Sequence, residues 1–282
     1  MKSAILIVLA LVSGHSAAME LRRGTFDYEG RTLSFFCAGS GEPTLVLEAP
    51  SGISNEEAFA NVIEDLSAGH TVCAYERAFY GESEPLADGQ IQSLQDYVDE
   101  LAAFLDSQHQ TQPIILVGYS YGGWVSRSYA ANHPERVAGL VLIDSPHVQW
   151  MRQMKSKMDV EDWVKVEDIF EWFLANRGHD AWNSQFEMEA TPDLPPNLPL
   201  AVITRTQDHE RMRLSGISEA AFRIYNDVHF ELAPDLLNLT ERTIGFSATQ
   251  SQHYIPESEP EIVLEAVQAV VTLTNTDHSD LK

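Results

Sequence analysis

Short apolar runs alternate with amphipathic stretches along most of this chain. The runs are rich in β-branched and aliphatic residues and end at glycine or polar residues, as is typical of buried strands. The stretches between them carry apolar residues at helical spacing. This alternation predicts an α/β fold, with a mostly parallel sheet and helices on both faces. The first two strands, separated by Gly39-Ser40-Gly41, are expected to pair like a hairpin. The strand candidates are residues 32–37, 44–47, 71–75, 114–117, 140–143, 200–204 and 243–247, and the helix candidates are 56–66, 94–107, 121–132, 218–237 and 261–273.

Residues 148–198 break the alternation. The stretch is too long for a plain connection between two strands, so it must carry structure of its own. It contains four of the five tryptophans and ends in a proline-rich segment. We expect a helical cap that covers an apolar cleft with aromatic side chains. The cap would be inserted into a core formed by residues 19–147 and 199–282.

The first 18 residues have the pattern of a signal peptide. Lys2 precedes an apolar run, residues 4–12, and Ser16-Ala17-Ala18 closes the segment. The run is shorter than the roughly 20 residues that span a bilayer. No cysteine that could carry a lipid follows it. We therefore expect cleavage after Ala18 and a secreted or periplasmic protein without a membrane anchor.

Composition narrows the possible partners. The 282 residues include 44% hydrophobic residues, enough for one substantial core. The net charge of −24 produces a surface that repels nucleic acid and anionic lipid headgroups. We therefore expect a small-molecule substrate and no nucleic-acid partner, and leave the oligomeric state open.

The most specific motif is Gly118-Tyr119-Ser120-Tyr121-Gly122. It follows a predicted strand directly and precedes a predicted helix, which is the context of a nucleophile elbow. The glycines are needed because side chains on either side of the sharp turn would collide with the strand or the helix. The motif predicts that Ser120 is a nucleophile.

A serine hydroxyl becomes a useful nucleophile only when a base removes its proton. His253 follows the strand candidate 243–247 through a polar loop and precedes the last helix. A residue there projects from the carboxyl edge of the sheet, where the elbow also lies. His253 is therefore the predicted base.

Two aspartates compete to be the carboxylate that orients this histidine. Asp208 follows the strand 200–204 by a few residues and is the preferred candidate. Asp144 lies directly at the end of the strand 140–143 and is the alternative acid if the loop of Asp208 turns away. Asp144 could otherwise be an ordinary strand-end residue that bonds nearby backbone.

These features resemble the α/β-hydrolase superfamily across nearly all of the chain after residue 18. They are similar in particular to its capped members: small esterases, proline-iminopeptidase-like enzymes and cofactor-free haloperoxidases. The order Ser120, Asp208, His253 is the order of that superfamily. The resemblance implies an eight-stranded sheet with a helical cap. The stretches that carry it are 45–52, 73–83, 118–123, 137–144, and 253–255 with 260–261.

The chain departs from the family pattern after its third strand, where Ala49-Pro50 replaces the usual His-Gly. By position in the family, Ser51 supplies one oxyanion-hole N–H and Tyr121 the other. Pro50 has no N–H and cannot donate. A second departure is Glu76-Arg77 with Phe79, where the family has Asp-Arg and a glycine, which affects the shape of the neighbouring loop.

Together these residues predict a serine hydrolase that cleaves a neutral or apolar ester through an acyl-enzyme. An aminopeptidase-like amide hydrolase would use the same triad and stays an alternative, as does a non-catalytic binding protein of this fold. A serine at the elbow disfavours dehalogenase chemistry, which needs a carboxylate there. Asp208-His209 and His179-Asp180 are isolated pairs without metal-site spacing, so we expect no metal and no cofactor.

Cys37 and Cys73 are the only two cysteines. In the sheet order that the resemblance implies, the second strand runs antiparallel beside the fourth, so the two sulfurs lie on neighbouring strands. An oxidising compartment would allow a disulfide between them. The alternative is a pair of buried free thiols.

Overall fold

The computed structural model describes residues 21–279, with side chains described as far as residue 276. The predicted signal peptide, residues 1–18, lies outside the described residues. None of the helices in the described part of the chain combines the length and the apolar character needed to cross a membrane.

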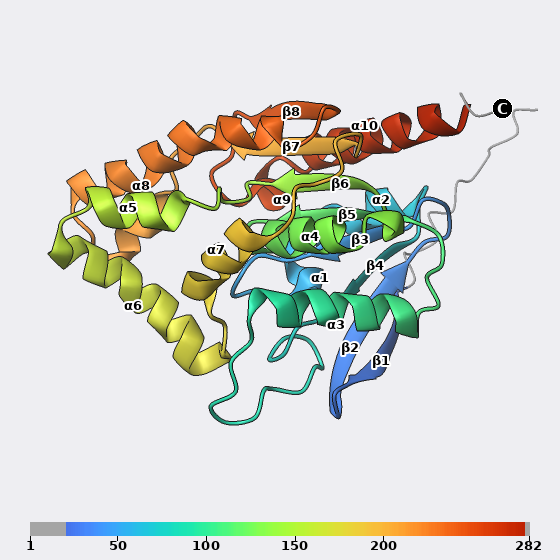
Figure 1. Ribbon diagram of the computed structural model, residues 1–282, viewed down its shortest axis with the longest axis horizontal. Helices are drawn as coiled ribbons and strands as arrows, with labels where there is room; N and C mark the ends of the chain where they lie inside the picture. The colour runs from blue at the N-terminus through green and yellow to red at the C-terminus, as the bar shows by residue number, and fades with distance from the viewer. Residues whose placement is uncertain (1–20, 280–282) are drawn as a thin grey trace, which may run out of the picture.

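One sheet of eight strands organises the molecule (Figure 1). The strand order is β1-β2-β4-β3-β5-β6-β7-β8. β2 pairs antiparallel with both of its neighbours and all other pairs are parallel, so the predicted eight-stranded fold is confirmed. The strands are β1 (Arg22–Tyr28), β2 (Arg31–Ala38), β3 (Leu45–Glu48), β4 (Val72–Tyr75), β5 (Ile114–Tyr119), β6 (Val137–Ile143), β7 (Leu200–Arg205) and β8 (Thr243–Ala248).

Helices cover both faces of the sheet, and each face has its own apolar core. On one face α3, α4 and α8 pack against strand residues such as Leu116 and Leu142. On the other face α2 and α10 pack against residues such as Val117 and Ile143. The helices are α1 (Asn55–Ala58), α2 (Ile63–Ser67), α3 (Leu94–Ser107), α4 (Tyr121–Asn132), α5 (Trp150–Lys157), α6 (Val160–Arg177), α7 (Ala181–Ala190), α8 (Glu219–Leu232), α9 (Ile255–Ser258) and α10 (Pro260–Ser279), with 3₁₀ turns η1 (Pro134–Arg136), η2 (Glu210–Ser215) and η3 (Ala233–Asn238).

The expected hairpin between the first two predicted strands is wrong. β4 lies between β2 and β3, so the connecting loop crosses the start of β4. Thr71 donates its backbone N–H to Gly41 at 2.9 Å, and Leu45 donates to Thr71 at 2.8 Å. Gly39, with φ +69°, lies so close to the end of α2 that a Cβ would be 2.2 Å from the Ser67 carbonyl oxygen. The glycines therefore permit a close crossing instead of a tight hairpin turn.

The strand β1 was missing from the sequence prediction. It is an edge strand in which Phe26 is the one buried residue, so the strand carries little hydrophobic periodicity. The predicted helix 56–66 is also divided in the structure into α1 and α2.

Three helices, α5, α6 and α7, occupy the stretch between β6 and β7. They gather with α8 at one end of the molecule, away from β1 and β2 (Figure 1). Met154, Trp163 and Met188 of these helices are buried and belong to the same apolar core as α4 and α8. We call residues 148–198 the helical insertion.

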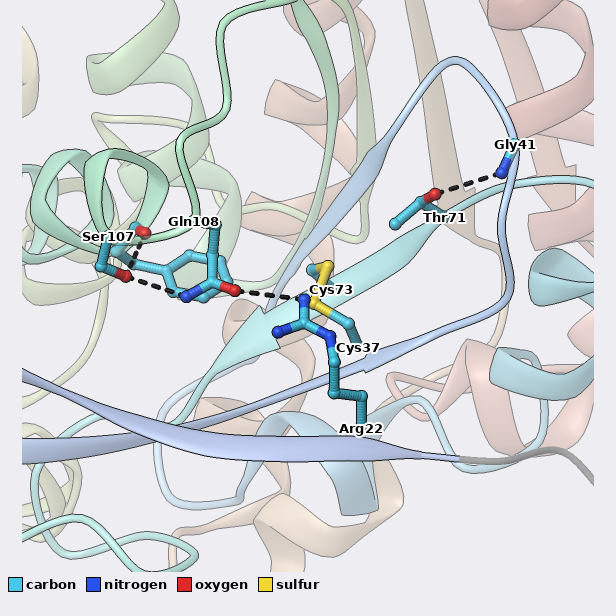
Figure 2. Close-up of a disulfide and its surroundings, with 8 residues drawn as sticks. Arg22, Cys37, Gly41, Thr71, Cys73, Ser107 and Gln108 are labelled. Atoms are coloured by element: carbon cyan, nitrogen blue, oxygen red, sulfur yellow. Dashed lines mark hydrogen bonds between the residues drawn. A yellow bond between two sulfur atoms is a disulfide. The ribbon is translucent and has the colours of Figure 1, made fainter.

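Cys37 of β2 and Cys73 of β4 form a disulfide (Figure 2). The two residues are direct cross-strand partners, and their Cα atoms are 4.1 Å apart. The bond joins residues 36 positions apart in the sequence. Nearby, Arg22 of β1 donates to Gln108 after α3 at 3.1 Å, and Gly41 donates to Thr71 at 3.2 Å.

Removing this disulfide should lower the free energy of unfolding. For a loop of this length the chain-entropy model gives about 3 to 4 kcal/mol. Urea unfolding of Cys37→Ala/Cys73→Ala measures the loss. Dithiothreitol should lower the unfolding free energy of the wild type to a value near that of the variant, and should leave the unfolding free energy of the variant unchanged. Equal unfolding free energies for the wild type and the variant would contradict the expectation.

Candidate active site

Ser120 occupies the turn between β5 and α4. Its backbone has φ 54° and ψ −121°, a strained conformation for a residue other than glycine. A Cβ on Gly122 would lie 2.1 Å from the Glu48 carbonyl oxygen, and one on Gly118 would lie 2.6 Å from the Gly122 oxygen. Any side chain at position 118 or 122 would therefore collide with neighbouring backbone. The Ser120 hydroxyl makes no capping hydrogen bond to the helix that it precedes.

His253 lies beside this turn. The Tyr119 hydroxyl donates to the His253 carbonyl oxygen at 2.7 Å, and the two ring centroids are 5.2 Å apart. The residue next to Ser120 therefore fixes the loop that carries the histidine. His253 Nδ1 lies 2.7 Å from Asp144 Oδ2. This contact directs Nδ1 toward the carboxylate and leaves Nε2 for another partner.

The carboxylate partner of His253 is thus Asp144, and the preference for Asp208 is corrected. β6 and β7 are neighbours in the sheet, and Asp144 follows the last residue of β6 directly. Its side chain is 1% exposed. Asp208 lies beyond the end of β7 on a loop that runs out to solvent, where it is exposed. Chain order does not distinguish the two aspartates, since both lie between Ser120 and His253. Asp208 was preferred for its place shortly after the strand 200–204, and the position of Asp144 directly at a buried strand end is the feature that favoured it.

Three groups from three different elements surround the Asp144 carboxylate. His253 comes from the loop after β8, the Arg205 Nε of β7 lies 3.3 Å from Oδ2, and the His229 Nε2 of α8 lies 3.0 Å from Oδ1. The backbone N–H of Arg205 also donates to Oδ1 at 3.2 Å. Burial alone would raise the pKa of Asp144, but His229 and His253 hold that pKa well below its usual value. The carboxylate is therefore charged at neutral pH.

A further histidine, His209, packs beside His253, with ring centroids 5.0 Å apart. Its backbone N–H donates to the Asn226 side chain at 2.8 Å. Burial, together with the neighbouring His253 and Arg205, lowers the pKa of His209 to about 3. It therefore adds a neutral ring beside the base. Neither His209 nor His229 was identified from the sequence, since both reach the site from segments without a recognisable motif.

The turn after β3 brings Ser51 next to the start of α4. Glu48 pairs with Gly118 across β3 and β5, and the close packing of Gly122 on Glu48 joins the two turns. Tyr121 is the first residue of α4, so its N–H has no intrahelical acceptor. The backbone hydrogen bonds of the described turns include none donated by Ser51. The hydrogen bonds recorded for the described residues thus include none donated by the backbone N–H of Ser51 or Tyr121, and their role as oxyanion-hole donors stays a prediction.

The helical insertion contacts the same turn through His179, which follows α6. The Ser51 Oγ lies 2.8 Å from His179 Nε2, and the Tyr97 hydroxyl lies 3.0 Å from His179 Nδ1. His179 is 5% exposed. Burial and the nearby Arg77 lower the pKa of His179 to about 3, so the imidazole is neutral and links the insertion to the core.

Glu76-Arg77, the second departure from the family pattern, has a clear structural role. Arg77 Nη2 donates to the buried Glu48 carboxylate at 2.6 Å. The Glu76 carboxylate accepts the backbone N–H of Asn55 at 2.7 Å, at the start of α1. Phe79 has φ 73°, a conformation that usually favours glycine. The loop thus keeps a glycine-like backbone with a phenylalanine in it.

The eight-stranded fold is that of α/β-hydrolases, and Ser120, Asp144 and His253 follow one another along the chain in the order of that fold. A family model described as alpha/beta hydrolase fold matches residues 44–177. This match supports the resemblance to the α/β-hydrolase superfamily that the sequence motifs indicate.

Individual relatives are distant. The chain is 27% identical over 45% of its length to a cis-3-alkyl-4-alkyloxetan-2-one decarboxylase of Shewanella oneidensis, and the match spans 40% of that protein. Among solved structures, an esterase of Thermogutta terrifontis aligns with a TM-score of 0.60 at 18% identity, covering 92% of this chain and 99% of the esterase. Cfl2 of Burkholderia cenocepacia aligns with a TM-score of 0.61 at 19% identity, covering 88% and 95%.

The buried state of His179 predicts a pH-dependent stability. Unfolded histidine has a pKa near 6.5, so between about pH 6.5 and 3 the unfolded chain binds a proton that folded His179 does not. Its contribution is fully present above this window and is lost as the pH falls through it. The difference in unfolding free energy between wild type and His179→Gln should decrease by about 2 kcal/mol from pH 7 to pH 5.

Urea unfolding at pH 7, 6 and 5 measures this difference. His109→Asn is the matched control, because His109 is exposed in the folded protein as in the unfolded chain. Its difference from the wild type should stay constant. A constant difference for His179→Gln as well would show that the folded protein binds the proton on His179.

Proposed function

We propose that this protein is a serine hydrolase that cleaves a neutral carboxylic ester through an acyl-enzyme at Ser120. The observation that carries the proposal is the hydrogen bond from His253 Nδ1 to Asp144, made on a loop that the residue next to Ser120 holds in place. A buried carboxylate, an oriented imidazole and a serine on a strained turn are the parts of a catalytic triad.

In the proposed reaction the Ser120 oxygen attacks the ester carbonyl carbon while His253 Nε2 takes the hydroxyl proton. The negative charge that develops on the carbonyl oxygen is stabilised by the N–H groups of Ser51 and Tyr121. Asp144 stabilises the imidazolium. His253 then gives the proton to the leaving alcohol, and a water molecule releases the acid by the same steps in reverse order.

A cavity beside the site supports a neutral substrate. It has a volume of about 330 Å³ and is lined by Pro50, Tyr119 and Tyr254, the direct chain neighbours of Ser51, Ser120 and His253. Ile53 and Pro256 add apolar surface, and Glu57 and Glu257 add negative charge. These acids, together with the net charge of −24, disfavour an anionic ester.

We further propose that the protein is exported and that residues 1–18 are removed, since the Cys37–Cys73 disulfide is of a kind that persists in oxidising compartments. The helical insertion would act as the cap over the substrate. Phe173 in α6 supports this role, because a Cβ on Gly52 in the turn after β3 would lie 3.0 Å from its ring.

A fluorophosphonate probe should label the protein once, at Ser120, and Ser120→Ala should abolish the labelling. Peptide mapping by mass spectrometry identifies the modified residue. As a control, Ser126→Ala removes a buried serine hydroxyl of α4 and should leave labelling unchanged. Labelling that survives in Ser120→Ala would exclude Ser120 as the nucleophile.

Substrate charge gives a second test. p-Nitrophenyl butyrate should be hydrolysed at least about ten times faster than p-nitrophenyl hemisuccinate, because the hemisuccinate adds a carboxylate near Glu57 and Glu257. Comparison of kcat/KM with that for an aminoacyl-nitroanilide measures ester against amide preference. A faster reaction with the hemisuccinate or the anilide would contradict the proposed substrate class.

The two aspartates should differ sharply in their effect on turnover. Asp144→Asn should lower kcat by about three to four orders of magnitude, since an amide no longer holds the imidazole in the required tautomer. Asp208→Asn changes an exposed side chain and should alter kcat by no more than about twofold. Circular dichroism checks that both variants fold. A greater decrease in kcat for Asp208→Asn than for Asp144→Asn would show that Asp208 is the acid.

A further inference from the structure

Arg127 of α4 is a buried cation without an anionic partner. Its side chain faces the helical insertion, and the residue is 8% exposed. Nε and Nη1 are enclosed and have no hydrogen-bond partner, and the ion pairs recorded for the described part of the chain include none to Arg127. The other buried arginines, Arg77 and Arg205, each contact a carboxylate.

An isolated charge inside a protein is unfavourable unless something neutralises it. Burial lowers the pKa of Arg127 to about 10, with no neighbouring charge contributing to the shift, so the guanidinium is still charged at neutral pH. Nη2 is not among the enclosed nitrogens, so it is the donor that a carboxylate oxygen in a neighbouring cavity would reach.

Arg127 lines a cavity of about 720 Å³, which is large enough for an organic molecule. The cavity lies where α4, the end of α7 and the segment after η3 meet. Part of its wall is apolar, with Val148, Met188 and Leu194 from the two ends of the helical insertion and Leu239 from the segment after η3. This wall suits a hydrocarbon chain next to the cation.

The remaining charges in the cavity wall select the charge of the ligand. Glu189, Asp193 and Glu241 all line the cavity. Glu189 is engaged by Arg152, but Asp193 and Glu241 are exposed and form no ion pair recorded for the described residues. Three acids around one cation repel a dianion such as phosphate more strongly than a monoanion, so only a ligand whose single charge lies directly on Arg127 fits this wall.

We propose that this cavity is a binding site for a medium-chain organic monocarboxylate, with its carboxylate on Arg127 and its chain along Val148, Met188 and Leu194. The site is separate from Ser120, since none of the residues that line it belongs to the candidate active site. Because both ends of the helical insertion contribute to the wall, a bound carboxylate would join the insertion to α4. The proposal does not rest on the proposed hydrolase activity.

Isothermal titration calorimetry with sodium octanoate tests the site in the intact protein. Arg127→Met should weaken octanoate binding by at least about tenfold, because it removes a charge-assisted pair and keeps a side chain of similar length. Arg223→Met, which removes an exposed arginine of α8, should bind octanoate as the wild type does. Arg127→Met should not affect any octanoate that binds near Ser120. The binding that is lost in Arg127→Met is therefore binding to the cavity.

Two ligand controls separate charge from shape. 1-Octanol should bind the wild type and Arg127→Met equally, and inorganic phosphate should bind the wild type more weakly than octanoate does. Phosphate binding as tight as that of octanoate would overturn the assignment to an organic monoanion. Unchanged octanoate affinity in Arg127→Met would overturn the site itself.

Stability distinguishes a ligand site from a structural role. Since Arg127 has no recorded partner among the described residues, ligand-free Arg127→Met should unfold at a temperature equal to or above that of the wild type. A clearly lower temperature would show that the guanidinium has structural partners and would contradict the proposal. If Arg127→Met does not fold, Arg127→Lys decides, because it keeps the charge and should retain octanoate binding, and loss of binding there would overturn the site.

Discussion

The carboxylate of Asp144 is the constraint on which the candidate site depends. It is removed from water at the end of β6, where a charge is stable only if other groups neutralise it. Arg205 of β7 supplies the opposite charge, and His229 of α8 and His253 of the loop after β8 lie within hydrogen-bond distance of the carboxylate. The fold therefore has to bring three separate segments to one strand end. The same requirement places His253 next to the turn of Ser120.

The buried arginines of the described residues each contact a carboxylate, with one exception. Asp144 has three neighbouring donors, and Glu48 is paired with Arg77 beneath the turn of Ser51. Arg127 alone among the buried arginines of the described residues has no such partner, and it lies at the junction between the core and the helical insertion. Because the other buried arginines have carboxylate partners, we infer that Arg127 contacts a ligand. The insertion thus meets the core at a neutral contact through His179 and at a charged one through Arg127.

Local chemistry made part of the site predictable. The glycines around Ser120 are fixed by backbone packing that any sharp strand-to-helix turn requires, and His253 lies between a recognisable strand and a recognisable helix. The choice between Asp144 and Asp208 was not local, because it depends on where the loop after β7 goes. The positions of His229, His209 and His179 depend on the packing of α8 and of the insertion. The hydrophobic pattern also did not predict the edge strand β1 or the way residues 39–44 cross β4. Both depend on which strands pair in the sheet.

The most direct test of the account is a crystal structure of the protein after reaction with diethyl p-nitrophenyl phosphate, which mimics the proposed tetrahedral intermediate. We predict that phosphorus is bonded to Ser120 Oγ and that the phosphoryl oxygen accepts hydrogen bonds from the N–H groups of Ser51 and Tyr121. His253 should contact the adduct through Nε2 and Asp144 through Nδ1. Modification of a different residue, or an adduct in which His253 turns away from Asp144, would contradict this prediction.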